Sequence, residues 1–91
     1  MVIKKDTLFV VQLKKILIYI AKDKRTAAVK FESELNKKIL LLPDNPYLFR
    51  QSHYFDSNLY RDLIYSGYTV IYKVDGVDIL ILEIFKWQEK W

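Results

Sequence analysis

The stretch "GYTVIYKVDGVDILILEIF", residues 67–85, decides the fold. Two runs rich in β-branched, aromatic and aliphatic residues flank Asp75-Gly76. An Asp-Gly pair between such runs is a strong signal for a tight β-hairpin. We therefore predict strands at 68–74 and 77–85, with the more apolar second strand at the centre of the sheet. Upstream, "YRDLIY" at 60–65 and the turn residues Ser66-Gly67 extend the hairpin to an antiparallel meander.

Two apolar stripes with helical spacing precede the strands. The first predicts a helix from about residue 7 to 22, capped by Asp6-Thr7. The second predicts a helix that ends at Leu42, because proline lacks the backbone N–H and Pro43 and Pro46 follow. The stripes consist of Phe9, Leu13, Ile16 and Ile20 in the first helix and Ala28, Phe31, Leu35, Ile39 and Leu42 in the second.

The order of these elements predicts one α+β domain over residues 1–91. A short edge strand at Val2-Ile3 leads into a helical hairpin, a surface loop spans 43–58, and the meander follows. The hairpin is expected to pack on one face of a small antiparallel sheet, since the helix stripes need an apolar surface to cover. No predicted element remains for the other face. We therefore expect that face to be open and to carry the working surface.

Composition limits the class of protein. The chain has 91 residues, of which 52% are hydrophobic, and it has no cysteine, which excludes disulfides and thiolate metal sites. No apolar run approaches the roughly 20 residues of a membrane span, and "MVIKKD" is unlike a signal peptide. We expect a cytoplasmic protein with no membrane association, no cofactor, no metal and no small-molecule substrate. The formal net charge of +4 is compatible with nucleic acid or an acidic protein as partner.

Several segments resemble the ParE/RelE superfamily of bacterial type II toxins. "ILIYIAKDKRTAAVKF" (16–31) is similar to the family's Y-I-A-x-D-x-x-x-A-x-x-F stretch, and "LLPDNPYLFR" (41–50) to its L-x-x-x-P segment. "YRDLIYSGYTVIYKVDG" (60–76) is similar to its R-x-L…Y-x-V-x-Y-x-V-x-G signature, and "ILEIFKW" (81–87) to its last strand. The resemblance covers nearly the whole chain in the family's order and spacing.

The resemblance implies the toxin half of a toxin–antitoxin pair. In this family the open sheet face and the chain's end meet the target, and the antitoxin's C-terminal segment wraps the toxin. The implied target-binding residues are Arg61, Lys73, Glu83, Lys86, Trp87 and Trp91. The implied antitoxin-binding residues are Lys14, Lys15 and Lys22, whose charge would attract an acidic partner.

The family divides between mRNA endonucleases of the RelE type and gyrase poisons of the ParE type. Cleavage of RNA needs a base, an acid and cations in position. Where RelE-type nucleases carry cations this chain has Tyr60, Asp62 and Thr69, and no Tyr or His follows Lys86-Trp87. We therefore predict a non-enzymatic gyrase poison, closer to the ParE branch. The alternatives are a ribosome-dependent endonuclease with an altered set of catalytic residues and a non-toxic module that binds the antitoxin. They stay open because "KWQEKW" lacks the His or Arg that a ParE ending often has near Lys86 and Trp87.

Individual residues allow alternatives. His53 is either a catalytic histidine or a solvated loop residue. Glu83 is either a base of shifted pKa or a carboxylate that lies on the open face or pairs with a lysine. Arg61 either contacts a phosphate or carboxylate on the open face, or holds the sheet through an ion pair with Asp62, Asp78 or Glu83.

The basic and aromatic residues have a simpler alternative, a solvated or core-packing role. The strand lysines can be charges that prevent a sheet edge from pairing with another chain, and the helix lysines can form a solvent-exposed helix face. The two tryptophans share a face if the tail is helical, and they either dock into a partner or fold onto the core. The residues concerned are Lys73 and Lys86, Lys14, Lys15 and Lys22, and Trp87 and Trp91.

Overall fold

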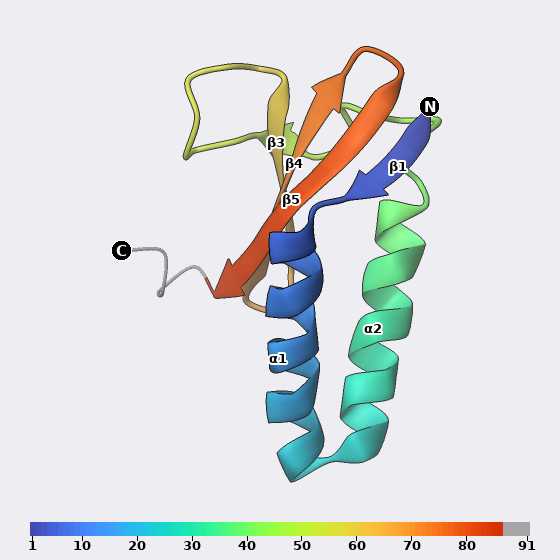
Figure 1. Cartoon of the computed structure of the whole chain (residues 1–91), viewed down its shortest axis with the longest axis vertical. Coiled ribbons are helices and arrows are strands. Elements are labelled where there is room, and N and C mark those ends of the chain that lie inside the picture. The colour runs from blue at the N-terminus through green and yellow to red at the C-terminus, as the bar shows by residue number, and fades with distance from the viewer. Residues whose placement is uncertain (87–91) are drawn as a thin grey trace.

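The computed structural model describes residues 1–86, so Trp87 and Trp91 lie outside the described residues. A helical hairpin follows the first strand, and four strands follow the hairpin (Figure 1). The elements are β1 (Val2–Lys5), α1 (Thr7–Asp23), α2 (Arg25–Ile39), β2 (Arg50–Gln51), β3 (Tyr60–Tyr65), β4 (Tyr68–Asp75) and β5 (Asp78–Lys86). The α+β class and the helical hairpin predicted from the sequence are confirmed.

The hairpin forms where the stripes predict it. Asp6 caps α1, because its carboxylate accepts a hydrogen bond of 2.8 Å from the backbone N–H of Leu8. Lys24 alone joins the two antiparallel helices in an extended conformation. α2 ends at Ile39, earlier than predicted, and the chain continues in turns through Leu42, which is still fully buried.

The sheet has five strands in the order β1-β5-β4-β3-β2. β4 is the middle strand, so the prediction that the last strand is central is wrong by one place. β1 pairs with β5 in parallel, from Val2 beside Asp78 to Lys5 beside Ile81, which makes the sheet mixed rather than wholly antiparallel. The predicted loop also contains a two-residue strand, β2, that pairs antiparallel with β3.

The main core lies between the hairpin and one face of the sheet. α1 contributes Phe9, which is fully buried, and α2 contributes its buried apolar stripe. The two helices lie side by side (Figure 1). Both helices cover the same face of β4 and β5, as expected for an amphipathic hairpin. The sheet residues of this core are Leu63, Tyr68, Val70, Tyr72, Val74, Ile79, Ile81 and Ile84.

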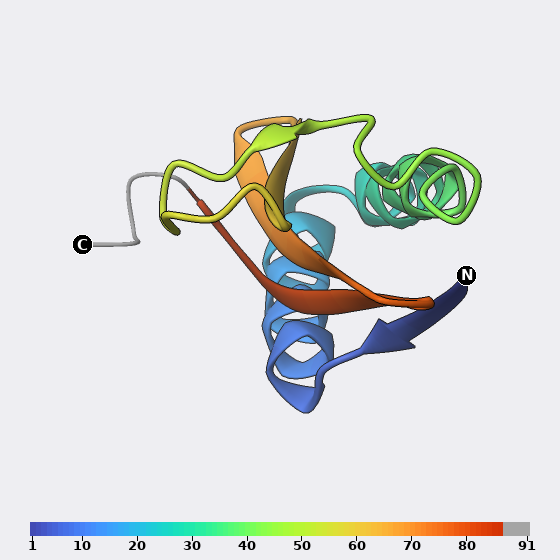
Figure 2. The same ribbon diagram turned by 90° about the horizontal axis from the view of Figure 1, so that it is seen from above.

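The second face of the sheet is only partly open. Thr69 and Ile71, which alternate with the core residues of β4, are 2% and 0% exposed. The segment 50–59 folds back along this face, on the far side of the sheet from α2 (Figure 2). The Tyr54 ring meets Phe85 edge-on, with centroids 5.4 Å apart. The predicted open face is therefore partly covered by residues of the loop itself.

Candidate functional site

An apolar groove runs along the helical hairpin. It has a volume of about 440 Å³ and takes its walls from both helices. Val29 on α2 is 64% exposed and lines this groove. Lys5 and Lys14 carry positive charge at the groove, and Glu32 is its acidic residue among those described. The apolar lining comprises Phe9, Val10, Leu13, Leu17, Ile18, Ala21, Ala28 and Val29.

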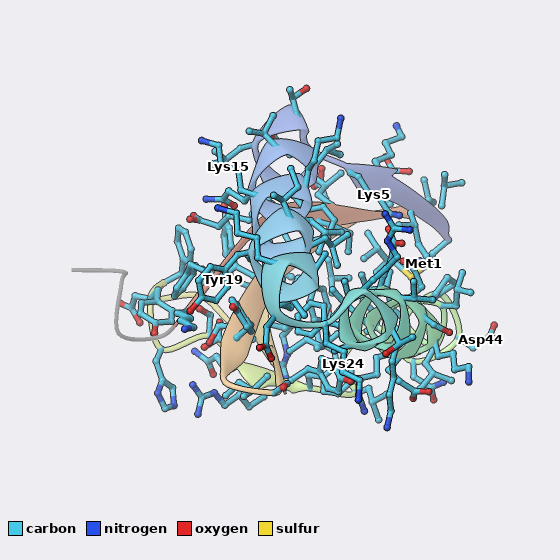
Figure 3. All side chains as sticks on the ribbon, turned by 90° about the horizontal axis from the view of Figure 1, so that it is seen from below. Met1, Lys5, Lys15, Tyr19, Lys24 and Asp44 are labelled. Carbon is cyan, nitrogen blue, oxygen red and sulfur yellow. The ribbon has the colours of Figure 1, made fainter. Side chains whose placement is uncertain are left out.

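The three helix lysines do not lie together. Lys14 lines the apolar groove, whereas Lys15 lines a second hollow on another side of α1. Successive helical residues are about 100° apart around the axis, so neighbours in sequence face different surroundings. Figure 3 shows Lys15 and Tyr19 on the side of α1 opposite to Lys5. Lys22 is exposed near the closed end of the hairpin.

The second hollow joins α1 to the end of the sheet. It has a volume of about 250 Å³ and is lined by Lys15, Ile16, Tyr19, Tyr68 and Lys86. The Lys86 ammonium lies 5.4 Å from the centre of the Tyr19 ring and 5.8 Å from that of Tyr68. Lys86 shares the sheet face of Ile84, two residues earlier, so it lies on the helix side and not on the second face.

Arg61 also lies on the helix side of the sheet. It lies two residues before Leu63, a core residue, and therefore on the same face of β3. Its guanidinium binds the loop that leads into the sheet. Nε donates to the carbonyl of Phe49 at 3.0 Å, and Nη1 to that of Asn58 at 3.0 Å. Nη2 lies 3.5 Å from the Tyr47 carbonyl, and the group stacks over the Tyr47 ring at 5.2 Å. The predicted place on an open face is wrong, and the hydrogen bonds of this arginine go to backbone carbonyls.

Asp62 pairs with a different arginine. Its buried carboxylate forms an ion pair with Arg50, whose Nη2 lies 3.4 Å away. The carboxylate also accepts a hydrogen bond of 3.0 Å from the backbone N–H of His53. Within residues 1–86, its Oδ1 has no hydrogen-bond partner. The His53 side chain is exposed, which agrees with the solvated alternative for that residue. This network holds the segment 50–59 against the sheet.

The remaining predicted strand residues lie on the second face. Lys73 is half-buried, with its ammonium 5.4 Å from the centre of the Tyr60 ring. Glu83 is half-buried and lies opposite Ile71 on the neighbouring strand. The predicted target-binding set is therefore divided: Arg61 and Lys86 lie on the helix side, and Lys73 and Glu83 on the other.

Sequence reasoning missed three residues that organise these surfaces. Gln12 accepts the backbone N–H of Ile84 at 2.8 Å, at the edge of β5 that β1 leaves uncovered. Tyr72 donates its hydroxyl to the Pro46 carbonyl at 2.8 Å, and burial raises the pKa of this phenol above its ordinary value. Tyr19 lies outside the apolar stripe of its helix, which is the one sequence signal that marks it as a surface residue.

Residues 1–86 contain neither a metal-binding cluster nor a helix suited to crossing a membrane. Among the described residues, no group of three His, Cys, Asp or Glu side chains could hold a metal ion. Over the same part of the chain, no helix has the length and apolarity needed to cross a membrane.

The arrangement of a helical hairpin on a five-stranded sheet is shared with a solved toxin–antitoxin structure. That structure is described as the chromosomal ParDE TA system from P. aeruginosa, with a TM-score of 0.75 and 21% identity. The match covers 94% of this chain and 95% of that chain, so the two share a fold over nearly their whole lengths. At 21% identity this likeness establishes the shared fold.

The family model confirms the resemblance. The model for the ParE toxin of the type II toxin-antitoxin system parDE matches residues 3–91. The chain belongs to this family and is a ParE-type toxin of a type II toxin–antitoxin system. Comparison with curated protein sequences finds no match.

Proposed function

We propose that this toxin stops growth in the cytoplasm by poisoning DNA gyrase, and that a cognate antitoxin neutralises it. The observation that carries the gyrase proposal is family membership over residues 3–91. Poisoning here means that the toxin binds gyrase and traps its cleaved DNA state. This mechanism asks the toxin for a binding surface rather than for a set of catalytic groups.

The chemistry of the strand positions supports gyrase over mRNA cleavage. Where RelE-type nucleases carry cations, this toxin has Asp62, which is buried beside Arg50, and Thr69, which is 2% exposed. Stabilising a phosphorane requires accessible positive charge at the reacting phosphate. A buried carboxylate and a buried hydroxyl supply none. The endonuclease alternative would therefore need groups from elsewhere on the surface.

The groove along α1 and α2 is suited to the antitoxin. Its lining from Phe9 to Ala21 spans about 18 Å, which is the length of about three turns of a bound helix. An amphipathic helix binds such a groove through apolar residues spaced three and four apart. Lys5 and Lys14 at the groove favour acidic residues beside those apolar anchors.

The gyrase proposal has a direct test. Purified toxin is mixed with gyrase, ATP and supercoiled plasmid, and the DNA is examined after detergent and protease. We expect linear DNA that requires both toxin and gyrase and that disappears when antitoxin is added first. Normal supercoiling without linear DNA would refute gyrase poisoning. Mapping of cuts in translated mRNA would then test the endonuclease alternative, and normal growth on strong induction would favour the non-toxic module.

The groove proposal is tested with two exposed valines. Val29→Glu places a charge in the groove, whereas Val77→Glu places the same charge at the β4–β5 turn, where Val77 is 74% exposed. The probe is the antitoxin encoded beside the toxin gene. We expect Val29→Glu to weaken binding at least tenfold, because the carboxylate must be desolvated against apolar side chains. Equal affinities for the two variants would show that the antitoxin docks elsewhere.

A further inference from the structure

The second hollow brings together four side chains from three elements. Lys15 and Tyr19 are four residues apart on α1 and so lie on one face of the helix. Tyr68 and Lys86 are directly opposite each other in the β4–β5 ladder. The Tyr19 ring and the Tyr68 ring both lie within 6 Å of the Lys86 ammonium, which joins the helical pair to the strand pair.

The chemistry of this hollow is cationic and aromatic. Lys15 and Lys86 supply two ammonium groups, and none of the described residues that line the hollow is acidic. The Lys86 ammonium is held over two rings, a cation–π arrangement that limits the freedom of a long side chain. Tyr19 is 63% exposed, so much of its ring remains available to a planar ligand group.

We propose that Lys15, Tyr19, Tyr68 and Lys86 form a contact site for single-stranded DNA. The two lysines pair with phosphates of the backbone, and Tyr19 stacks on a base. Proteins that bind single strands without sequence preference combine these two elements, a positive surface along the backbone and aromatic rings for the bases. The inference goes beyond the proposed function, because this binding requires neither gyrase nor antitoxin.

The lining of the hollow favours nucleic acid over an acidic peptide. An amphipathic peptide helix needs an apolar surface to bind. The large apolar groove, which Lys14 lines, is separate from this hollow. Apart from the two tyrosines, Ile16 is the single apolar residue among those described that line this hollow. An acidic peptide would pair with the two lysines and leave the exposed Tyr19 ring without a partner. A nucleotide uses the lysines through its phosphate and the ring through its base.

The test measures anisotropy of a fluorescent 12-nucleotide oligo(dT) with the purified toxin over a series of salt concentrations. The variants are Lys15→Ala, Lys86→Ala and Tyr19→Leu. The control is Lys30→Ala, which removes the same charge from an exposed position of α2. Circular dichroism of each variant confirms that it is folded. Lys86→Arg, which keeps the charge, checks that Lys86→Ala acts through charge and not through folding.

The salt dependence is measured as the slope of log K against log salt concentration. We expect Lys15→Ala and Lys86→Ala each to reduce the magnitude of this slope by about 0.7, the value for one phosphate contact on a single strand. Lys30→Ala and Lys86→Arg should match the wild type. Tyr19→Leu should weaken binding about 5- to 150-fold, as expected for loss of one base stack. No binding by the wild type at low salt would overturn the inference, as would equal losses for Lys15→Ala and Lys30→Ala. Binding of a poly-glutamate peptide that depends on Lys15, without binding of the oligonucleotide, would also overturn it. Gyrase is absent from this assay, so a failure of gyrase poisoning does not alter the result.

Discussion

Replacement of Arg61 by alanine tests whether this residue acts on the fold or on a target. The guanidinium makes two hydrogen bonds of 3.0 Å to the carbonyls of Phe49 and Asn58, a longer contact to that of Tyr47, and a stack over the Tyr47 ring. A hydrogen bond to a charged group contributes about 1.5–3 kcal/mol when buried, and less at this half-buried site. The cation–π contact adds about 0.5–1 kcal/mol.

The sum predicts a loss of about 2–4 kcal/mol in the free energy of unfolding for Arg61→Ala. For a domain of this size, that loss corresponds to a fall in Tm of about 8–30 °C. Urea and thermal unfolding measure both quantities. Arg25→Ala, at an exposed position at the start of α2, is the matched control and should change the free energy by less than about 0.5 kcal/mol.

Because Arg61 holds the loop 47–58 to the sheet, we expect toxicity and antitoxin binding to fall together in Arg61→Ala, in proportion to the folded fraction. The refuting result is a variant as stable as Arg25→Ala that has lost toxicity and kept antitoxin binding. That outcome would assign Arg61 to direct target contact, as the family resemblance implies, and would remove the structural role argued from its three carbonyl contacts.

Three further sets of substitutions test other parts of the structure. Gln12→Leu leaves the backbone N–H of Ile84 without its acceptor and should lower the free energy of unfolding, measured in urea, by about 1–3 kcal/mol. Gln12→Glu keeps an acceptor oxygen and should lower it less. Equal losses for the two variants would contradict the role of this hydrogen bond. Burial raises the pKa of Tyr72 above the ordinary 10.0, so its contribution to stability is complete below that pH and is lost as pH rises through the folded-state pKa. Tyr72→Phe should therefore lose less stability than the wild type between neutral and strongly alkaline pH, and parallel curves would refute this. Lys14→Ala should weaken antitoxin binding about two- to fivefold and leave oligonucleotide binding unchanged. Lys15→Ala should weaken oligonucleotide binding and leave antitoxin binding unchanged. Equal effects of both variants in both titrations would contradict the separation of the two surfaces.

The elements of the fold follow from local patterns in the sequence. Helical spacing and the Asp75-Gly76 turn each depend on residues close in the chain, and the predicted helices and strands match the structure within a few positions. The parallel pairing of β1 with β5 could not be read in this way, because it joins residues about 76 positions apart. Neither could the cover over the second face, since the loop has no period that predicts which side of the sheet it follows.

The sequence suggested residues for a site but not how the structure would arrange them. Alternation along β3 was sufficient to place Arg61 on the same face as Leu63, once that face was known to meet the helices. The convergence of Lys15 with Lys86 had no sequence signal, because it depends on how α1 lies across the end of β5. The second hollow therefore depends on contacts between distant segments, which a periodic pattern does not encode.

The parallel pairing of the first and last described strands has a consequence for synthesis. Every residue that lines the apolar groove lies between positions 5 and 32, whereas the second hollow is incomplete until Lys86 is made. The ribosome thus produces the residues of the proposed antitoxin groove long before it produces β5, and β1 lacks its β5 partner until then. With the antitoxin docked as proposed, its site is synthesised first, and the order of translation would allow it to bind before β5 completes the sheet.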